Sequence, residues 1–485
     1  MTSSTVKEVQ PDTNSHQWRY HITPDLRMLP SKLSFMFFYG SHACYIMYFN
    51  IFFTSVGLTA SQAGQISGIH ALSSLLGAPL WGLLADYTGK RKVLMLVSSI
   101  IKLCLIFPLP WIAEYVNYID MRQHEKFRHD KELQHVKYCT TLCGDDTMFH
   151  VMMSMLIASG PLILAITSFL DSFVMNLVKS STKETDFGRQ RLFGSIGFGS
   201  ASLIAGYAVD NYTNKYLSVY TAAFYVFLPL WLLFIPLAFY VAMVSELETA
   251  VKPQYLHAFP ERKNEQRSLT MSVLKTCGTL PNMIFLFTVF LTGICNGLMI
   301  GFFYLYMKRE LSSSNTVMGV SIAFGNLGEL FMFPVSYKLI KMVGTIPCLI
   351  SGIFAYFLRY IFLSIITDPW LSLPIQLLNA FCFALFIAAA IEHVVKISPK
   401  EICTTMVSIV NALKFGFGIL VANMAGGATY DSYGGRMLFK GMAFICLAWT
   451  CFMIIYYYGD KLFRTLCVSV NDDKKDTKSS LNHRD

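Results

Sequence analysis

Long apolar runs separated by short polar segments dominate this chain. Twelve runs are long enough to cross a bilayer as a helix, which takes about 20 residues. They cover residues 33–53, 63–84, 93–116, 149–178, 192–209, 217–243, 281–307, 316–340, 346–366, 371–395, 404–428 and 437–458. The pattern predicts an all-α membrane protein with twelve transmembrane helices.

The composition agrees with this prediction. Apolar residues make up 54% of the 485-residue chain and charged residues 14%, whereas soluble domains are about 25% charged. Most of the 39 Lys and Arg residues fall in segments that face the cytosol if the N-terminus lies inside. Both termini are therefore expected in the cytosol, and the expected location is the plasma membrane. Because the net charge of +9 is explained as this orientation signal, no nucleic-acid partner is expected.

A proline–glycine spacing occurs once in each part of the chain. Pro79 precedes Gly89 by ten residues, and Pro334 precedes Gly344 by the same number. Each pair spans the end of an apolar run and the turn after it. Internal repeats of this kind are typical of transporters built from two related halves.

A second repeat supports the same division. The tripeptide Gly-Phe-Gly occurs at 197–199 and at 416–418, followed by Asp210 and Asp431 respectively. The two copies predict two pseudo-symmetric six-helix halves. The expected division is a tail 1–32, a first half 33–244 with an outer loop 117–148, a linker 245–275, a second half 276–458 and a tail 459–485.

Residues 82–92 combine turn, acidic and basic residues between two apolar runs. Gly82 lets one helix approach a neighbour closely, and Gly89 lets the chain reverse direction. The charge of Asp86, near a helix end, needs a partner helix or dipole to compensate it. The loop therefore has the features of a clasp that holds two helices in one conformation and releases them in another. Its defining residues are Gly82, Leu84, Asp86, Gly89, Lys90 and Arg91.

These six residues match the signature G-x-L-x-D-x-x-G-[RK]-[RK], so the chain resembles the major facilitator superfamily. Residues 187–197 resemble the entry to span five in lactose-permease-like symporters. They also resemble the animal orphan group of major facilitator superfamily domain-containing protein 6. Residues 377–390 are similar to that orphan group, in which a His is usual at the position of Asn379. The resemblance covers most of the transmembrane region and implies a major facilitator fold and alternating-access transport.

The second copy of the clasp departs from the first. Tyr337 and Lys341 stand where the first copy has its packing glycine and its acidic residue. The first clasp is therefore expected to dominate the gate, latching the cytosolic side together with Arg189 and Arg191.

Three charged residues of the second half lie inside predicted spans. Glu329, Arg359 and Lys414 are about 15–21 Å from the cytosolic ends of their helices, so they could meet near the midplane. An Arg beside a carboxylate can hold it ionised until a proton or substrate competes for the pair. The resembling symporters also carry an Arg in span nine, where Arg359 falls, as part of their proton machinery. Asn379 cannot titrate. The alternative to a functional site is a static buried ion pair.

The first half offers further candidates. Asp171 and Lys102 lie at similar depth and could form a structural pair or contact a ligand. His42 and Asn50 share the first span with three tyrosines, a composition that suits either a substrate cavity or ordinary packing. His70 is interpreted as a buried histidine rather than a proton carrier.

The remaining motifs add little chemistry. Cys139 and Cys143 lie four residues apart in the outer loop and could form a disulfide or stay free. Asn211 begins a glycosylation sequon close to the membrane. The sequence has no Gly-Lys-Ser/Thr phosphate loop, HExxH motif or paired CxxC motif. No cofactor, metal or enzyme activity is therefore expected.

The sequence as a whole predicts a secondary transporter that moves a small polar organic solute by alternating access. Uniport and proton-linked symport both fit, and the expected partners are the solute, protons in the symport case, and the lipid bilayer. The oligomeric state is left open. The alternative is a membrane receptor or interaction protein that keeps the fold without transporting. The long outer loop and the degenerate second clasp suit that alternative, whereas the three buried charges of the second half do not.

Overall fold

The computed structural model describes residues 28–128, 136–180, 187–213, 218–251, 266–399 and 402–481, and nearly all of these residues are helical. Ten stretches within them are long and apolar enough to cross a membrane. The first eight helices are α1 (Leu29–Ile46), α2 (Phe49–Ser55), α3 (Ala60–Thr88), α4 (Arg91–Ile106), α5 (Leu109–Arg128), α6 (Val136–Ser180), α7 (Phe187–Asp210) and α8 (Thr221–Val251).

The remaining elements include short 3₁₀ and π-helical segments as well as long helices. They are α9 (Gln266–Cys277), α10 (Leu280–Arg309), α11 (Asn315–Val343), α12 (Thr345–Ile365), the 3₁₀ turn η3 (Pro369–Leu371), α13 (Ser372–Gln376), the π-helical η4 (Ala380–Leu385), α14 (Phe386–Ile397), α15 (Cys403–Asn411), the π-helical η5 (Ala412–Phe417) and α16 (Gly418–Leu481).

Two features reconcile these ten stretches with the twelve predicted spans. The first predicted span is interrupted at residues 47 and 48, so α1 and α2 together cover it. The last stretch, Thr405–Gly459, is 55 residues long and contains the last two predicted spans. These two spans meet at Gly434, whose φ of 78° and ψ of 170° are not helical. Glycine tolerates this left-handed φ because it has no Cβ.

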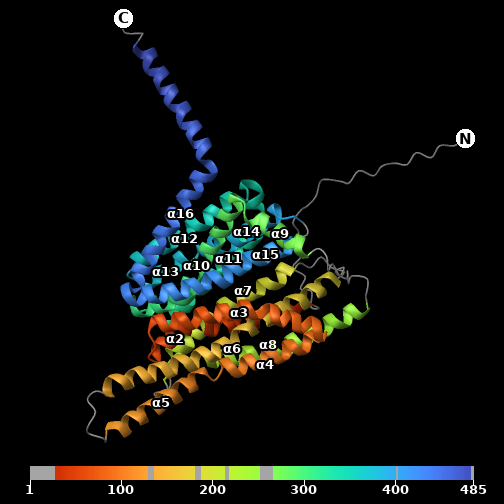
Figure 1. Cartoon of the computed structure of the whole chain (residues 1–485), viewed down its shortest axis with the longest axis vertical. Coiled ribbons are helices and arrows are strands. Elements are labelled where there is room, and N and C mark those ends of the chain that lie inside the picture. The colour runs from red at the N-terminus through yellow and green to blue at the C-terminus, as the bar shows by residue number, and fades with distance from the viewer. Residues whose placement is uncertain are drawn as a thin grey trace, which may run out of the picture.

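Figure 1 shows two groups of helices, one above the other. Helices α1–α8, red to yellow-green, form the lower group, which we call the N half. Helices α10–α16, green to blue, form the upper group, the C half. Within the N half α1 packs against α7 and α8, and within the C half α16 packs against α10 and α12. This is the all-α, two-half architecture that the repeat predicts.

The halves meet along two helix pairs, α3 with α16 and α7 with α11. Glycines let the backbones approach closely there. A Cβ on Gly64 would collide with the carbonyl group of Asn423, and a Cβ on Gly206 with that of Asn315. These contacts lie where α3 and α11 begin, whereas α15 packs against α10 and α14 of its own half. We call the end at which α3 and α11 begin the closed end, and the other the opposite end.

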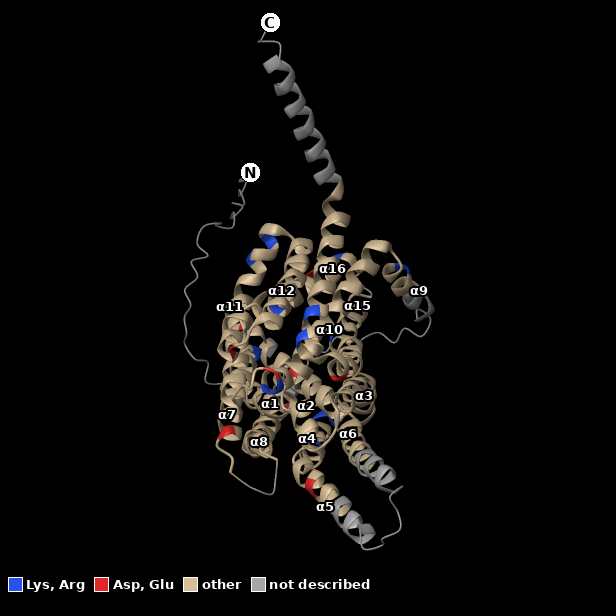
Figure 2. Ribbon diagram, turned by 90° about the vertical axis from the view of Figure 1, so that its left-hand side faces the viewer, with Lys and Arg blue, Asp and Glu red and all other residues tan. Residues whose placement is uncertain are grey.

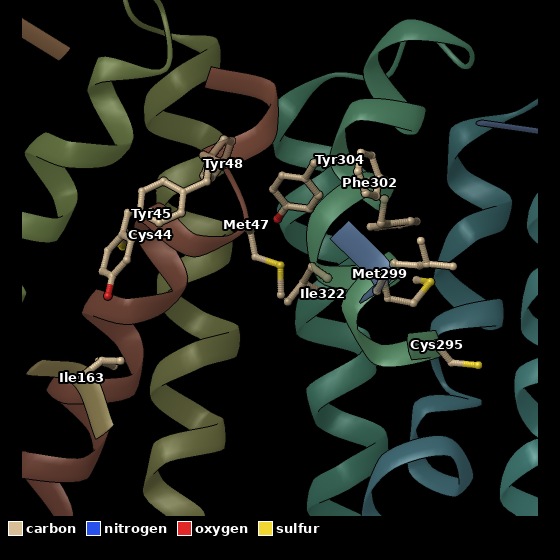
Figure 3. Packing of buried hydrophobic residues seen from close by; sticks show 14 of the residues in the cluster. Cys44, Tyr45, Met47, Tyr48, Ile163, Cys295, Met299, Phe302, Tyr304 and Ile322 are labelled. Carbon is tan, nitrogen blue, oxygen red and sulfur yellow. The ribbon is translucent and has the colours of Figure 1, made fainter. Parts of the chain in front are cut away.

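Buried side chains fill the contact between the halves near the closed end (Figure 3). Tyr48 and Tyr304 are both buried, and their rings meet edge to face with centroids 5.0 Å apart. Met47 of the N half and Ile322 of the C half belong to the same buried cluster. Apolar burial therefore continues across the boundary between the halves.

Helices extend into three segments that the sequence pattern assigns to a loop, a linker and a tail. Within the expected outer loop 117–148, α5 continues to Arg128 and α6 begins at Val136. At the expected linker 245–275, α8 continues to Val251 and α9 begins at Gln266; α16 continues to Leu481. The hydrophobic pattern marks only the part of a helix inside the bilayer, so it misses such polar extensions. The exact division into halves, linker and tails stays a prediction.

One stability test follows from the packing of α1 against α7. A Cβ on Gly197 would collide with the backbone of Met36, whereas nothing described lies within 4 Å of a Cβ on Gly441. Gly197→Ala is expected to destabilise the protein by about 1–3 kcal/mol through overpacking. Gly441→Ala, the matched control, should leave stability equal or higher because Ala favours helix. Thermal denaturation of the purified variants measures both, and an equal melting temperature for the two would contradict this packing.

Candidate functional site

A polar network inside the C half joins residues from α11, α12, α13 and the start of η4. Arg359 donates through Nη1 to Oδ1 of Asn379 at 2.6 Å and through Nη2 to Oε1 of Gln376. Asn379 in turn donates through Nδ2 to Oε1 of Glu329 at 2.5 Å. Glu329 and Arg359 are 8% and 4% exposed. The structure thus brings the predicted acid and base together, with the Asn379 amide as the bridge.

Lys414 lies beside this network. It belongs to η5 and is fully buried. Its amine has no hydrogen-bond partner among the described residues and faces the ring of Phe386, with the centroid 4.6 Å away. The amine also lies 5.2 Å from the ring centroid of Phe383, which follows Asn379 by four residues. Blue segments among α10, α11 and α12 in Figure 2 mark Lys and Arg inside the C half as well as at its ends. π-Helical turns such as η4 and η5 often mark functional positions in helices.

In the N half, Asp171 pairs with a residue other than Lys102. The sequence had left open whether Asp171 and Lys102 pair with each other or contact a ligand. Arg191 forms an ion pair with Asp171 at 3.2 Å and donates to the Tyr39 hydroxyl at 3.0 Å. Asp171 is therefore joined to Arg191 of α7 and not to Lys102. The guanidinium also lies 5.8 Å from the centroid of the Tyr39 ring. The three side chains connect α6, α7 and α1 within one half.

Lys102 is fully buried, and the part of the chain that the structure describes offers its amine no hydrogen-bond partner. The amine lies 5.4 Å from the ring centroid of Tyr45, whose hydroxyl is 2.7 Å from Nδ1 of His42. His70 is buried, and its Nε2 has no partner among described groups. This side of the N half is basic and aromatic.

Asn50 takes part in a contact between the halves. Its Oδ1 accepts from Ser67 at 2.5 Å, and its Nδ2 donates to Oδ1 of Asn423 at 3.5 Å. The sequence analysis singled out Asn50 but not Asn423, because nothing in the sequence of span eleven shows which helix it will face.

The clasp segment contacts its own half in this conformation. Gly89 ends α3 with a φ of 64°, the left-handed cap that favours glycine. Lys92 forms an ion pair with Glu246 of α8 at 2.7 Å. No described atom lies within 4 Å of a Cβ on Gly82, and Leu84 is exposed. Lys90, Arg91 and Arg189 are exposed. The side chain of Asp86 lies outside the described residues, as do those of Cys139 and Cys143.

The second copy keeps the turn of the clasp without its charge pattern. Gly344 ends α11 with a φ of 92°, and the amine of Lys341 lies over the ring of Tyr337, 4.4 Å from its centroid.

Asn211, the sequon residue, is exposed and donates to the carbonyl of Tyr207 at 2.8 Å.

Asp210 and Asp431 make contacts between the halves that sequence reasoning missed. Asp210, at the end of α7, accepts from the backbone N–H groups of Asn315 and Thr316 at 2.9 and 2.7 Å. The side chains of these two residues also donate to it, at 2.8 and 2.6 Å. Asp210 therefore lies at the N-terminus of α11, a helix of the other half. Asp431 contacts the N-terminus of α3, which also belongs to the half opposite its own. Both aspartates follow a copy of the repeated Gly-Phe-Gly tripeptide in the sequence. The sequence analysis used them only to recognise the repeat and did not predict a contact between the halves.

The Asp431 contact repeats this arrangement on the second helix pair. Its carboxylate accepts from the backbone N–H groups of Ala60 and Ser61 at 3.0 and 2.6 Å. Unpaired N–H groups and the dipole make a helix N-terminus attractive to a carboxylate. The two contacts are related by the internal repeat: span five caps span eight, and span eleven caps span two.

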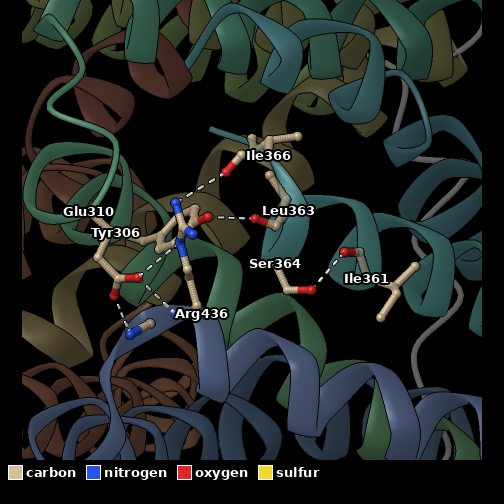
Figure 4. Close-up of polar contacts among 8 residues, drawn as sticks. Tyr306, Glu310, Ile361, Leu363, Ser364, Ile366 and Arg436 are labelled. Carbon is tan, nitrogen blue, oxygen red and sulfur yellow. Dashed lines mark hydrogen bonds and ion pairs between the residues drawn. The ribbon is translucent and has the colours of Figure 1, made fainter. Parts of the chain in front are cut away.

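A third carboxylate at the closed end acts within one half (Figure 4). Glu310 accepts from the backbone N–H groups of Gly435 and Arg436, and its Oε2 lies 3.8 Å from Nε of Arg436. Nearby, the hydroxyl of Tyr306 donates to the carbonyl of Leu363 at 2.5 Å. All these residues belong to the C half, so this cap does not join the halves.

The family of the chain can now be stated. A family model described as the MFS_1 like family matches residues 29–441, most of the chain. The chain belongs to the MFS_1 like family. This confirms the resemblance to the major facilitator superfamily and the fold expected from it.

Proteins from other organisms are similar in sequence. The chain is 23% identical over 384 residues to the uncharacterized transporter YwbF of Bacillus subtilis, covering 77% of this chain and 79% of that protein. It is 25% identical over 195 residues to major facilitator superfamily domain-containing protein 6-like protein A of Xenopus laevis, covering 40% of this chain and 32% of that protein. The MFS_1 like family and these relatives support membrane transport of a small-molecule solute by a multi-pass protein.

A solved structure has the same fold. The crystal structure of the nucleoside transporter NupG superposes with a TM-score of 0.66 at 12% identity, covering 89% of this chain and 99% of that one. The fold of this MFS_1 like chain is therefore that of the major facilitator transporters.

The bridging amide gives a stability prediction. Asn379→Leu leaves Glu329 and Arg359 each without one buried partner, so it is expected to destabilise the protein by about 1–3 kcal/mol. Asn326→Ala is the matched control, because among the described residues the Asn326 amide bonds to the carbonyl of Ile322 in its own helix, at 2.9 Å. Thermal denaturation compares the two variants, and a larger loss for the control would contradict the bridge.

Proposed function

We propose that this protein is a secondary active transporter that carries a small polar organic solute by alternating access, with proton movement coupled through Glu329. The observation that carries this proposal is the arrangement of contacts between the halves. Two aspartate caps and close glycine contacts join the halves at the closed end. At the opposite end, α15 and the clasp contact their own halves. A protein that rocks between two states needs such one-sided contacts.

The caps have the strength that a reversible gate requires. A carboxylate at an exposed helix N-terminus is worth about 0.3–1 kcal/mol. Two of them favour the closed state by an amount that differential binding of a solute can reverse. In the other state the clasp, with Arg189 and Arg191, would form the corresponding contacts at the opposite end. To form those contacts, Arg191 would have to break its present ion pair with Asp171.

Glu329 is the group in the C-half network suited to carry a proton. Asn379, its hydrogen-bond donor, is an amide and cannot titrate. Protonation of Glu329 would remove the only carboxylate of the network and leave Arg359 and Lys414 without a counter-charge. That change alters the balance of charge inside the C half, as expected for coupling between a proton and a solute.

The distribution of Lys and Arg supports an orientation in which the opposite end and both termini are cytosolic. The closed end, with Asn211 and the 117–148 segment, is then extracellular, and the plasma membrane is the proposed location. His42 and Asn50 of the first span would face the solute path from the N half.

Removal of the caps tests alternating access. The double variant Asp210→Asn and Asp431→Asn should separate the halves at the closed end and shift the conformational ratio about threefold to thirtyfold, if each cap contributes about 0.3–1 kcal/mol. Spin labels at the exposed positions Val219 and Tyr433, in a cysteine-free background, report the distance between the halves at that end.

The matched control is Glu310→Gln, which removes the same kind of cap within the C half. Its distance distribution should stay that of the unsubstituted protein. Equal distributions for all three proteins would contradict the role of the two aspartates as a gate.

Transport itself is tested in proteoliposomes with a panel of polar solutes, measured with and without a pH gradient. Glu329→Gln should abolish gradient-driven uptake and proton flux. Glu392→Gln should retain both, because Glu392 pairs with Lys396 on the surface of α14 at 2.7 Å. Unchanged gradient-driven uptake in Glu329→Gln would refute the coupling assignment. If neither protons nor any solute moves, the non-transporting alternative replaces this proposal.

A further inference from the structure

The C-half network contains more hydrogen-bond donors than acceptors. Nε of Arg359, Nε2 of Gln376 and Nζ of Lys414 are buried and have no partner among described atoms. All three are donors only. An unsatisfied buried donor costs about 1–3 kcal/mol, and a charged one costs more. Three such donors in one network would be satisfied together by an acceptor on a bound solute.

The three donors converge on the same place. Arg359 and Gln376 are hydrogen-bonded to each other. The amine of Lys414 lies 5.2 and 4.6 Å from the ring centroids of Phe383 and Phe386, which follow Asn379 by four and seven residues. Among the described residues, the network itself contributes one carboxylate, Glu329, which accepts from the Asn379 amide. The network has a net positive charge and lies inside a membrane-spanning bundle, where an uncompensated charge is costly.

We propose that this network binds the anionic group of the solute, a carboxylate or phosphate, through Arg359, Gln376 and Lys414. This rests on the proposed transport function and names its substrate class. A guanidinium donates in a planar fork that fits two oxygens of one anionic group, and an ammonium adds a point charge. Asn379 is half-buried, whereas Glu329, Arg359 and Gln376 are buried.

Other ligand classes fit this network less well. A cationic solute would be repelled by two cations and would bring donors to a place that lacks acceptors. A neutral polyol could accept some hydrogen bonds, but it would leave the excess positive charge uncompensated. An anion satisfies the donors and the charge together.

The buried lysine of the N half provides a comparison within the same chain. Lys102 is as buried as Lys414 and also has no hydrogen-bond partner in the described ranges. Its neighbours by printed distance are the Tyr45 ring, with the centroid 5.4 Å from the amine, and, through the Tyr45 hydroxyl, His42. No Arg fork and no carboxylate lie beside it among these neighbours, so the site is assigned to the C half.

Matched pairs of probes test the inference on purified full-length protein in detergent. Glucose is compared with glucuronate for the carboxylate and with glucose 6-phosphate for the phosphate, at equal ionic strength, by thermal denaturation. At least one anionic probe is expected to raise the melting temperature by about 2–4 °C more than glucose does. The relative effect of the two anions identifies which anionic group the site prefers.

Two variants test which half binds the anion. Lys414→Met should abolish the anion-dependent rise, and Lys102→Met should retain it. Both replace a buried, unpartnered ammonium by an apolar side chain of similar size, so both are expected to fold with equal or higher melting temperature.

Three results would overturn the proposal: no stabilisation by either anion, equal stabilisation by glucose, or the same response in Lys414→Met as in the unsubstituted protein. Loss of the response in Lys102→Met as well would also overturn the assignment to the C half. The assay measures binding without any conformational cycle. Its failure is therefore distinct from failure of the transport proposal, which is tested by flux and by the distances at the closed end.

Discussion

Two carboxylates at helix N-termini join the halves of this protein at its closed end. Asp210 accepts from the first N–H groups of α11, and Asp431 from those of α3. Each contact satisfies donors that a helix leaves unpaired at its start. Because each aspartate and the helix that it caps lie in different halves, the same hydrogen bonds that cap a helix also join the halves at one end of the molecule.

Close backbone packing makes these caps effective. At Gly64 and Gly206 the two halves approach until a single Cβ would not fit. Apolar lipid chains provide little hydrophobic drive for helices to associate, so small residues and polar contacts determine which faces meet. Near the closed end, small residues and polar contacts occur together. The opposite end has charges that pair within their own halves, such as Lys92 with Glu246, and these charges are available to form different contacts in another state.

The C half differs from the N half in its buried chemistry. Glu329, Asn379 and Arg359 form a chain of hydrogen bonds, while Lys414 faces aromatic rings without a hydrogen-bond partner among the residues described. In the N half the ion pair of Asp171 and Arg191 is closer to the surface, with side chains 27% and 48% exposed. Proton and anion chemistry is therefore proposed for the C half.

The sequence by itself determined the membrane class, the twelve spans and the two-half repeat, because these follow from hydrophobic length and from spacing along one chain. It also placed Glu329, Arg359 and Lys414 at comparable depth. Only the tertiary structure decided which groups meet: Asp171 with Arg191 instead of Lys102, Asn379 as a bridge, and the two repeat aspartates on helices of the opposite half. Depth along a helix can be counted from sequence, but the direction in which a side chain points depends on how that helix is rotated and packed. That rotation is set by contacts between segments more than a hundred residues apart, such as Asp210 with Asn315, and local sequence does not contain it.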